Sequence, residues 1–176
     1  MLESLSAVTK SGAKYGALAG FIATWSISTA IAASELELGL PMGTFYAIMG
    51  SSLGFGGLAA YAGFALHIAT GTALGAAMGY ASARLTKILF RTYGALAMGI
   101  AAGMAVWVTL FLPLTLLVVQ PSLSNRIDMP FTGQPVWGIA LSAIAFHAVW
   151  GAIFGYVTST LMRIRAFRIQ QEGVTH

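Results

Sequence analysis

Four stretches of predominantly apolar residues divide the chain, and each is long enough to cross a bilayer as a helix. A spanning helix needs about 20 residues, and the four stretches cover residues 14–34, 58–82, 93–119 and 137–161. The pattern predicts an all-α integral membrane four-helix bundle that forms one membrane domain over residues 1–176.

The composition agrees with a membrane protein and excludes several kinds of site. The chain is 57% hydrophobic and only 8% charged, whereas a soluble domain carries roughly 25% charged residues. It has no cysteine, which excludes disulfides, thiolate metal sites and cysteine nucleophiles. Its nine Lys and Arg residues form no dense block, so we do not expect nucleic acid as a partner.

The basic residues favour one orientation in the membrane. Eight of the nine flank the spans on a single side if the chain crosses four times: Lys10, Lys14, Arg84, Lys87, Arg91, Arg163, Arg165 and Arg168. Arg126 is the exception. Cytoplasmic loops carry the excess of Lys and Arg, so we expect a multi-pass protein of the cell (plasma) membrane with both termini in the cytoplasm.

The connection over residues 38–58 is apolar enough to compete as a fifth span. That alternative would place Arg84, Lys87 and Arg91 outside, against the charge rule. The segment also contains Pro41 and many glycines. We interpret residues 39–57 as an outer loop or a re-entrant segment, with a short helix near residues 44–49. Irregular backbone at membrane depth must be buried against protein.

The two halves of the sequence resemble each other, which predicts two helical hairpins in tandem. Residues 15–20 read YGALAG and residues 93–99 read YGALAMG. The second and fourth spans each carry a histidine followed by two glycines in the pattern His-x3-Gly-x3-Gly, at His67 and His147. We expect a parallel repeat, with one copy over residues 10–87, the other over 88–168, and a cytoplasmic tail over 169–176.

Small residues recur at every fourth position of each span, a spacing that is typical of close helix packing in membranes. Lipid provides no hydrophobic drive between helices, so tight contact between small residues supplies the association. The glycines to which we assign this packing role are Gly16, Gly20, Gly63, Gly71, Gly75, Gly79, Gly99, Gly103, Gly151 and Gly155.

His67 and His147 lie at matched depths in the outer half of their spans, and three interpretations stay open for them. Each imidazole can hydrogen-bond a neighbouring helix, through Thr24, Ser26, Ser28, Thr109 or a backbone carbonyl. The pair can instead bind a cofactor, either haem b or copper, or carry protons. Our expectation for the chain is no cofactor, with His67 and His147 as the ligands in the alternative case.

Few other residues are candidates for chemistry. Glu35, Glu37 and Asp128 form an outer acidic rim, which is either solvated or gathers cations at a pore mouth. Pro113 interrupts the third span and predicts a kink, because proline leaves the carbonyl near Thr109 without a donor. We find no catalytic residues, since no nucleophilic triad, phosphate-binding loop or zinc spacing occurs.

The chain resembles a broad group of four-span bacterial and archaeal membrane proteins that have no established activity. The residues that carry the resemblance are the Gly-Ala-rich opening at 17–20, the segments 67–80 and 147–156, and the Leu-Pro-Leu step at 112–114. The resemblance implies the fold. A weaker association, by type of protein only, is with accessory subunits of large archaeal membrane enzymes such as ammonia monooxygenase.

Three functions follow as hypotheses. The small-residue stripes favour a non-catalytic auxiliary or structural subunit of a larger membrane complex, whose partners are the lipid bilayer and other integral membrane subunits. The repeat and the outer acids favour a small channel or transporter instead. The paired histidines favour a membrane protein that binds a haem or copper cofactor.

Overall fold

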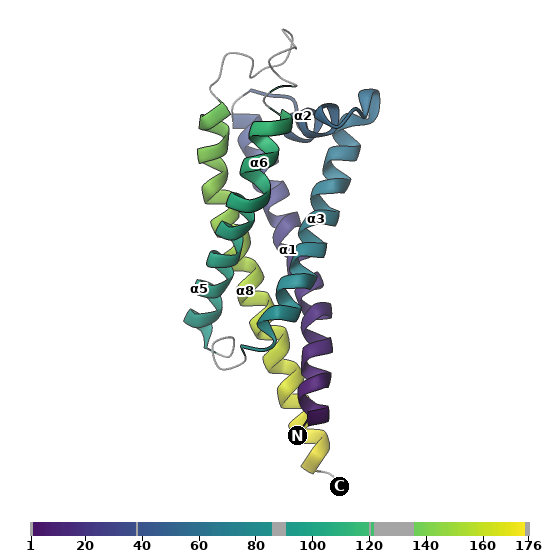
Figure 1. The fold of residues 1–176 in the computed structure, drawn as a ribbon, viewed down its shortest axis with the longest axis vertical. Helices are drawn as coiled ribbons and strands as arrows, with labels where there is room; N and C mark the ends of the chain where they lie inside the picture. The colour runs from purple at the N-terminus through teal and green to yellow at the C-terminus, as the bar shows by residue number, and fades with distance from the viewer. Residues whose placement is uncertain (1, 38, 86–90, 120, 122–135, 175–176) are drawn as a thin grey trace.

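The computed structural model describes residues 2–37, 39–85, 91–119, 121 and 136–174, and within these ranges the chain contains helices and no strand (Figure 1). The long helices are α1 (Leu2–Glu37), α3 (Ala59–Ser82), α5 (Thr92–Val106) and α8 (Val136–Val174). The shorter segments are α2 (Thr44–Ser52), η1 (Gly56–Leu58), η2 (Trp107–Phe111), α6 (Leu112–Leu114) and η3 (Thr115–Val119).

Four helices are long and apolar enough to cross a membrane, which confirms the predicted class of an all-helical membrane protein. They comprise Ser11–Glu37, Gly56–Ser82, Thr92–Val118 and Ala143–Gln171. The first and last continue as α-helix well past the predicted spans, to Leu2 at one end of the chain and Val174 at the other. These extensions carry four of the nine basic residues: Lys10, Arg163, Arg165 and Arg168.

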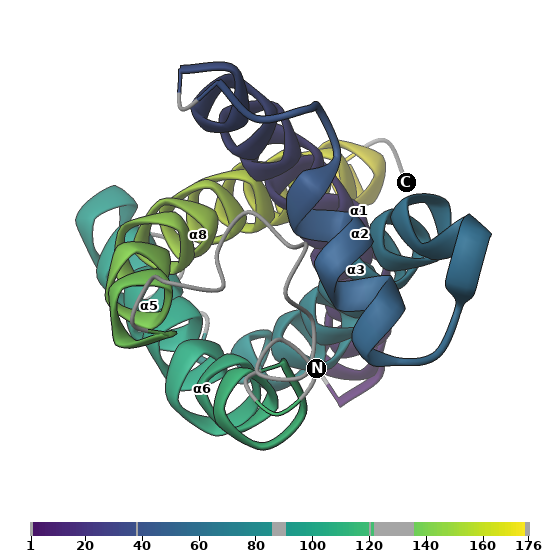
Figure 2. The ribbon, with the colours of Figure 1, turned by 90° about the horizontal axis from the view of Figure 1, so that it is seen from above.

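The four long helices run along one axis, and both chain ends lie at the end of the bundle opposite α2 (Figure 1). We call these the terminal end and the α2 end. Helix α1 packs against α3 and α8, and α8 also packs against α5. Helices α3 and α5 make very little contact in the described part of the chain. The helices therefore form an open series α3–α1–α8–α5 (Figure 2).

Glycines allow α1 and α3 to approach to backbone contact. A Cβ atom added to Gly16 would lie 2.6 Å from the Cα of Gly79, and one added to Gly75 would lie 2.7 Å from the Cα of Gly20. Real Cβ atoms do not come this close. The helices can therefore pack at this distance only while these positions lack side chains.

Helices α5 and α8 approach in the same way. A Cβ added to Gly99 would lie 2.9 Å from the Cα of Gly155, and one added to Gly151 would lie 2.8 Å from the carbonyl carbon of Gly99. A side chain at Gly103 would run into the carbonyl of His147. Each hairpin is thus closed by glycines in both of its helices.

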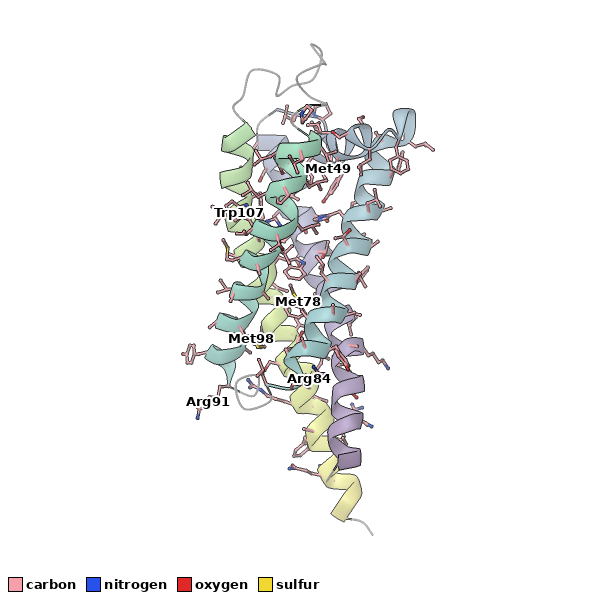
Figure 3. The ribbon with its side chains drawn as sticks, in the orientation of Figure 1. Met49, Met78, Arg84, Arg91, Met98 and Trp107 are labelled. Carbon is pink, nitrogen blue, oxygen red and sulfur yellow. The ribbon has the colours of Figure 1, made fainter. Side chains whose placement is uncertain are left out.

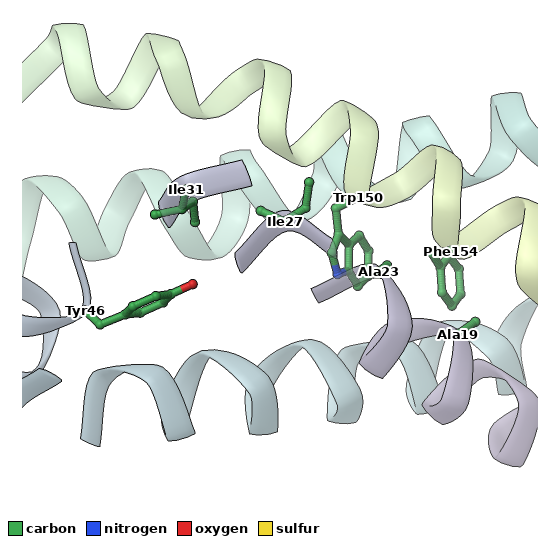
Figure 4. Close-up of a cluster of buried hydrophobic side chains, with 7 residues drawn as sticks. All are labelled: Ala19, Ala23, Ile27, Ile31, Tyr46, Trp150 and Phe154. Atoms are coloured by element: carbon green, nitrogen blue, oxygen red, sulfur yellow. The ribbon is translucent and has the colours of Figure 1, made fainter. Parts of the chain in front are cut away.

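Larger side chains join the two hairpins where α1 meets α8. Trp150 and Phe154 project from α8 onto Ala23 and Ala19 of α1, and their rings stack at a centroid distance of 5.4 Å (Figure 4). The indole N–H of Trp150 donates a hydrogen bond of 2.9 Å to Thr24 Oγ1. The small residues of α1 make the depression that these rings fill.

The third span departs from regular α-helix on both sides of Pro113. Two π-helical segments, η2 and η3, flank the short α6 in which Pro113 lies. Proline removes one donor and its ring presses on the carbonyl four residues earlier, so the helix widens locally into π turns. The disturbance predicted at Pro113 therefore takes the form of changed helical hydrogen bonding.

The connection after α1 folds back onto the bundle and contains α2, close to the short helix predicted at residues 44–49. Gly43 precedes α2 with a φ of 89°, a backbone conformation that L side chains rarely adopt. Helix α2 lies in backbone contact with the start of α3. A side chain at Gly50 would run into the backbone of Ala59, and one at Gly63 would run into the backbone of Tyr46. The segment is therefore ordered against protein, as its irregular backbone requires.

Candidate functional site

A group of polar side chains lies among α1, α2 and α3 at the α2 end of the bundle. We call Ser28, Glu35, Tyr46 and His67 the polar cluster. Tyr46 is its centre: its ring lies 5.5 Å from that of His67, centroid to centroid, and its hydroxyl interacts with Ser28 and Glu35. Helix α1 thus supplies two members, α2 one and α3 one.

Glu35 was predicted to belong to a solvated acidic rim, and this prediction is wrong. Its side chain is only 5% exposed, and its carboxylate accepts hydrogen bonds of 2.6 Å from the N–H of Gly43 and 2.7 Å from the N–H of Phe45. These groups open α2, where the first N–H groups have no partner within the helix. Glu35 therefore caps α2 from the end of α1, and its negative charge is offset by two amides.

Of the other two members of the predicted rim, the structure describes Glu37. Glu37 is exposed at the last position of α1. Asp128 lies outside the described residues. The described acids consequently offer no pair of carboxylates that would gather a cation.

Tyr46 is buried, with 6% of its surface exposed, and its hydroxyl oxygen has no hydrogen-bond partner. Ser28 lies close to this hydroxyl, but its own hydroxyl donates to the carbonyl of Thr24 at 2.9 Å and the two side chains do not reach hydrogen-bonding geometry. Burial raises the pKa of the Tyr46 phenol above its ordinary value of 10.0. The Ser28 hydroxyl lowers it in part, the nearby Glu35 charge raises it, and the net direction is upward. The phenol therefore stays protonated and keeps a proton to donate.

His67 projects from α3 toward α2, between the rings of Tyr46 and Phe45. Its Nε2 atom is buried and has no hydrogen-bond partner. Two neighbouring side chains of the polar cluster therefore each hold a buried polar atom without a partner. Such an atom costs about 1–3 kcal/mol.

His147 projects from α8 and lies against the ring of Phe111 in η2, at a centroid distance of 5.0 Å. Its Nδ1 atom is 2.8 Å from the carbonyl oxygen of Ala143 in the same helix. The imidazoles of His67 and His147 are near enough to interact electrostatically. The structure thus places the two histidines in the same region of the bundle, where each contacts different aromatic side chains.

The hydroxyls proposed as partners of the histidines each donate to a carbonyl of their own helix four residues earlier: Thr24 to Gly20, Ser26 to Ile22, Ser28 to Thr24 and Thr109 to Ala105. The Nδ1 atom of His147 also lies at a carbonyl of its own helix. The interpretation of these imidazoles as hydrogen-bonded links between helices stays a prediction.

The packing glycines all lie at helix contacts. Gly16, Gly20, Gly71, Gly75 and Gly79 line the contact of α1 with α3. Gly99, Gly103, Gly151 and Gly155 line the contact of α5 with α8, and Gly63 lies under α2. These glycine stripes are consequently covered by contacts within the chain, whereas alanines at every fourth position on another face of α3 stay exposed: Ala65, Ala69, Ala73, Ala77 and Ala81.

A metal site has little support in the described residues, which contain no group of three or more His, Asp and Glu side chains able to hold an ion. Haem ligation needs only two histidines. Aromatic rings already contact both imidazoles, since His67 lies against Phe45 and Tyr46 and His147 against Phe111.

Sequence reasoning missed Tyr46 and the capping role of Glu35. Both depend on the return of α2 onto α3, which brings residues from a connection next to residues of two spans. The Pro-Gly-rich stretch and the acid before it were the available signals. They indicated a turn and did not indicate which carboxylate would cap the helix.

Comparison with protein-family models, curated proteins and solved structures finds no match. The fold defines the class: an all-helical protein with four helices suited to crossing a membrane. The features that bear on function are the polar cluster, His147 and the basic terminal end.

Proposed function

We propose that the protein is a small membrane transporter or channel that admits a small, uncharged polar solute to the polar cluster at its α2 end. The observation that carries this proposal is the pair of buried polar atoms without partners, Tyr46 Oη and His67 Nε2, on adjacent rings. Polar side chains within a membrane are expensive and mark substrate pathways. A solute with both donor and acceptor groups would satisfy these two atoms.

The charges around the polar cluster favour an uncharged solute. The carboxylate of Glu35 is already bound by two amides. Arg84, Arg91 and Arg163 lie toward the other end of the bundle, where α3 ends, α5 begins and the termini lie (Figures 1 and 3). An anion taken into the cluster would find no opposite charge, and a cation would find only the Glu35 carboxylate, which two amides already bind. Burying an unpaired ion costs far more than burying a neutral polar group.

Two irregular elements border this region. Helix α2 packs on α3 and also touches η3 across the bundle. The π-helical η2 presents Phe111 to His147. Single π turns within helices are frequent at functional sites. Helix α2, which Glu35 caps and which packs on α3, lies at the entrance that we propose.

Membrane orientation and the repeat belong to the same proposal. We place the terminal end in the cytoplasm of a plasma membrane protein, because the basic residues gather there.

A duplicated hairpin is supported by the matching contacts in the two halves: Gly20 meets Gly71 and Gly75, and Gly99 meets Gly151 and Gly155. The histidines stand one turn before Gly71 and Gly151, at equivalent positions.

Reconstituted vesicles test the transport proposal. We expect purified protein to speed the equilibration of water, glycerol or urea, followed by light scattering after an osmotic step. Tyr46→Phe and His67→Leu should lower the rate for the transported solute several-fold without lowering the melting temperature, because each removes an unpartnered polar atom. Tyr61→Phe, at an exposed tyrosine of α3, is the matched control.

Two results would overturn it. One is a rate equal to that of protein-free vesicles for every uncharged solute tried. The other is full transport in both Tyr46→Phe and His67→Leu.

The cofactor alternative makes a separate prediction. The purified protein would show a haem absorbance band or contain stoichiometric copper, and His67→Leu would lose it.

A role as an auxiliary subunit is the second candidate, supported by an exposed aromatic group on α1. Phe21 and Trp25 stack at 6.1 Å, and Trp25 meets Phe64 of α3 edge-on at 5.6 Å. Trp25 is 52% exposed and lies next to Thr24, well inside the span, whereas membrane tryptophans usually gather at the interfaces. Native mass measurement after mild extraction tests this candidate, and a monodisperse monomer would contradict it.

A further inference from the structure

The terminal end of the bundle brings together residues from all four long helices. Ala83 directly after α3, Ala95 of α5 and Met162 of α8 form a buried apolar cluster, against which Tyr15 of α1 and Met98 pack. Arg84 directly follows Ala83, and Arg163 directly follows Met162. Two arginines therefore stand at the edge of one apolar cluster, at the depth where the spans end.

Arg163 is held in place, and neither of the acidic side chains that the structure describes lies near it. One of its terminal nitrogens donates a hydrogen bond of 3.2 Å to Thr92 Oγ1 at the start of α5. Its Nε atom is buried and has no partner. A guanidinium presents its donors as a planar fork that matches carboxylates and phosphates, so the unused Nε–H is a donor suited to an anion.

Arg84 is arranged in a similar way on α3. It donates a hydrogen bond of 3.2 Å to the hydroxyl of Tyr80 and its guanidinium lies 5.0 Å from the centre of that ring. Figure 3 shows Arg84 and Arg91 at this end of the molecule. The N-terminus of α5 is here too, and the positive end of its dipole adds to the field.

The acidic side chains that the structure describes are distant from these arginines. They are Glu35 and Glu37, which lie at the opposite end of the bundle.

We propose that Arg163 and Arg84 bind the phosphate of an anionic phospholipid at the terminal end, with Thr92 orienting Arg163. The phosphate would lie at headgroup depth, among the exposed tyrosines Tyr80, Tyr93 and Tyr156. Its acyl chains would lie along the side where α3 and α5 do not pack together. Basic sites between spans on the cytoplasmic side are the chemistry by which membrane proteins bind such headgroups. This inference is independent of the transport proposal.

The test measures the melting temperature in nanodiscs of phosphatidylcholine, alone or mixed with phosphatidylglycerol. A ligand that binds the folded state raises the melting temperature, so we expect the wild type to melt higher in the anionic mixture. Arg163→Gln should lose more than half of this lipid-dependent rise, and Arg163→Lys should keep more of it. Arg168→Gln, at an exposed arginine one helical turn beyond, is the matched control and should lose little.

For each variant we compare its melting temperature in the anionic mixture with its melting temperature in phosphatidylcholine alone. A variant that is less stable in both lipids therefore remains informative. Equal losses in Arg163→Gln and Arg168→Gln would overturn the proposal, because they would indicate a diffuse attraction between charges. Inorganic phosphate added to phosphatidylcholine nanodiscs is the remaining arm. Stabilisation by free phosphate as large as that by phosphatidylglycerol would assign the site to a soluble anion and overturn the lipid proposal.

Discussion

Removing the carboxylate of Glu35 should loosen α2 from the bundle, and the size of the effect can be worked out from the contacts. Glu35 accepts two backbone hydrogen bonds, of 2.6 and 2.7 Å, and is 5% exposed. A hydrogen bond to a charged group contributes about 1.5–3 kcal/mol. Packing of Tyr46 and Gly50 on α3 remains in the variant. We therefore expect Glu35→Ala to lower the free energy of local opening of α2 by about 3 kcal/mol, the lower end of the range for two such bonds.

Hydrogen exchange followed by mass spectrometry measures this directly on peptides that cover residues 39–58. Because each 1.4 kcal/mol is a factor of ten, the α2 amides of Glu35→Ala should exchange faster by about two orders of magnitude. Glu35→Gln keeps a side-chain oxygen and loses the charge, so its exchange should be intermediate. Peptides from α5, which Glu35 does not contact, should be unchanged.

Glu37→Ala is the matched control, since it removes an exposed carboxylate two positions away. The reasoning is refuted if Glu35→Ala and Glu37→Ala exchange alike in α2. That result would mean that the packing of Tyr46 and Gly50 alone holds the helix.

Two further predictions concern the helix contacts. Gly75→Ala should lower stability in detergent by about 1–3 kcal/mol, because the new Cβ would lie 2.7 Å from the Cα of Gly20, while Gly57→Ala, which meets open space, should not. Equal thermal melts would contradict this. Trp150→Phe should lose about 0.5–1.5 kcal/mol with its hydrogen bond to Thr24. A cycle with Thr24→Val should show coupling, and purely additive losses would count against the bond.

Much of the fold could be predicted because membrane burial leaves a strong local signal. The four spans follow from apolar length, and the contacting helix faces follow from glycines at every fourth position. The ends of α1 and α8 could not be placed, because the sequence before residue 14 and after residue 161 stays compatible with helix after it ceases to be apolar. The π turns around Pro113 were missed for a related reason, since a proline predicts a disturbance and does not specify its form.

The candidate site was predictable only in part. His67 and His147 stood out as the histidines within spans. Tyr46 is one tyrosine in a short apolar segment, and nothing in its neighbourhood marks it as buried. Its position is decided by a tertiary event, the docking of Gly50 on Ala59, and by the cap that Glu35 provides.

The two hairpins meet closely where α1 packs on α8 and not where α5 faces α3, and this difference bears on both proposals. Under the proposed duplication, α1 with α8 and α5 with α3 would be equivalent pairs, yet only the first is closely packed. Trp150, three positions after His147, fills the first contact, whereas the position three after His67 is Thr70, which is exposed. A threonine is too small to bridge the distance that an indole spans. With threonine at this position, α3 and α5 do not pack closely, and that side of the bundle stays open. His67 lies on α3, the helix that borders this side, so a Thr70→Trp variant that restored the bridge should slow solute entry and weaken lipid binding together.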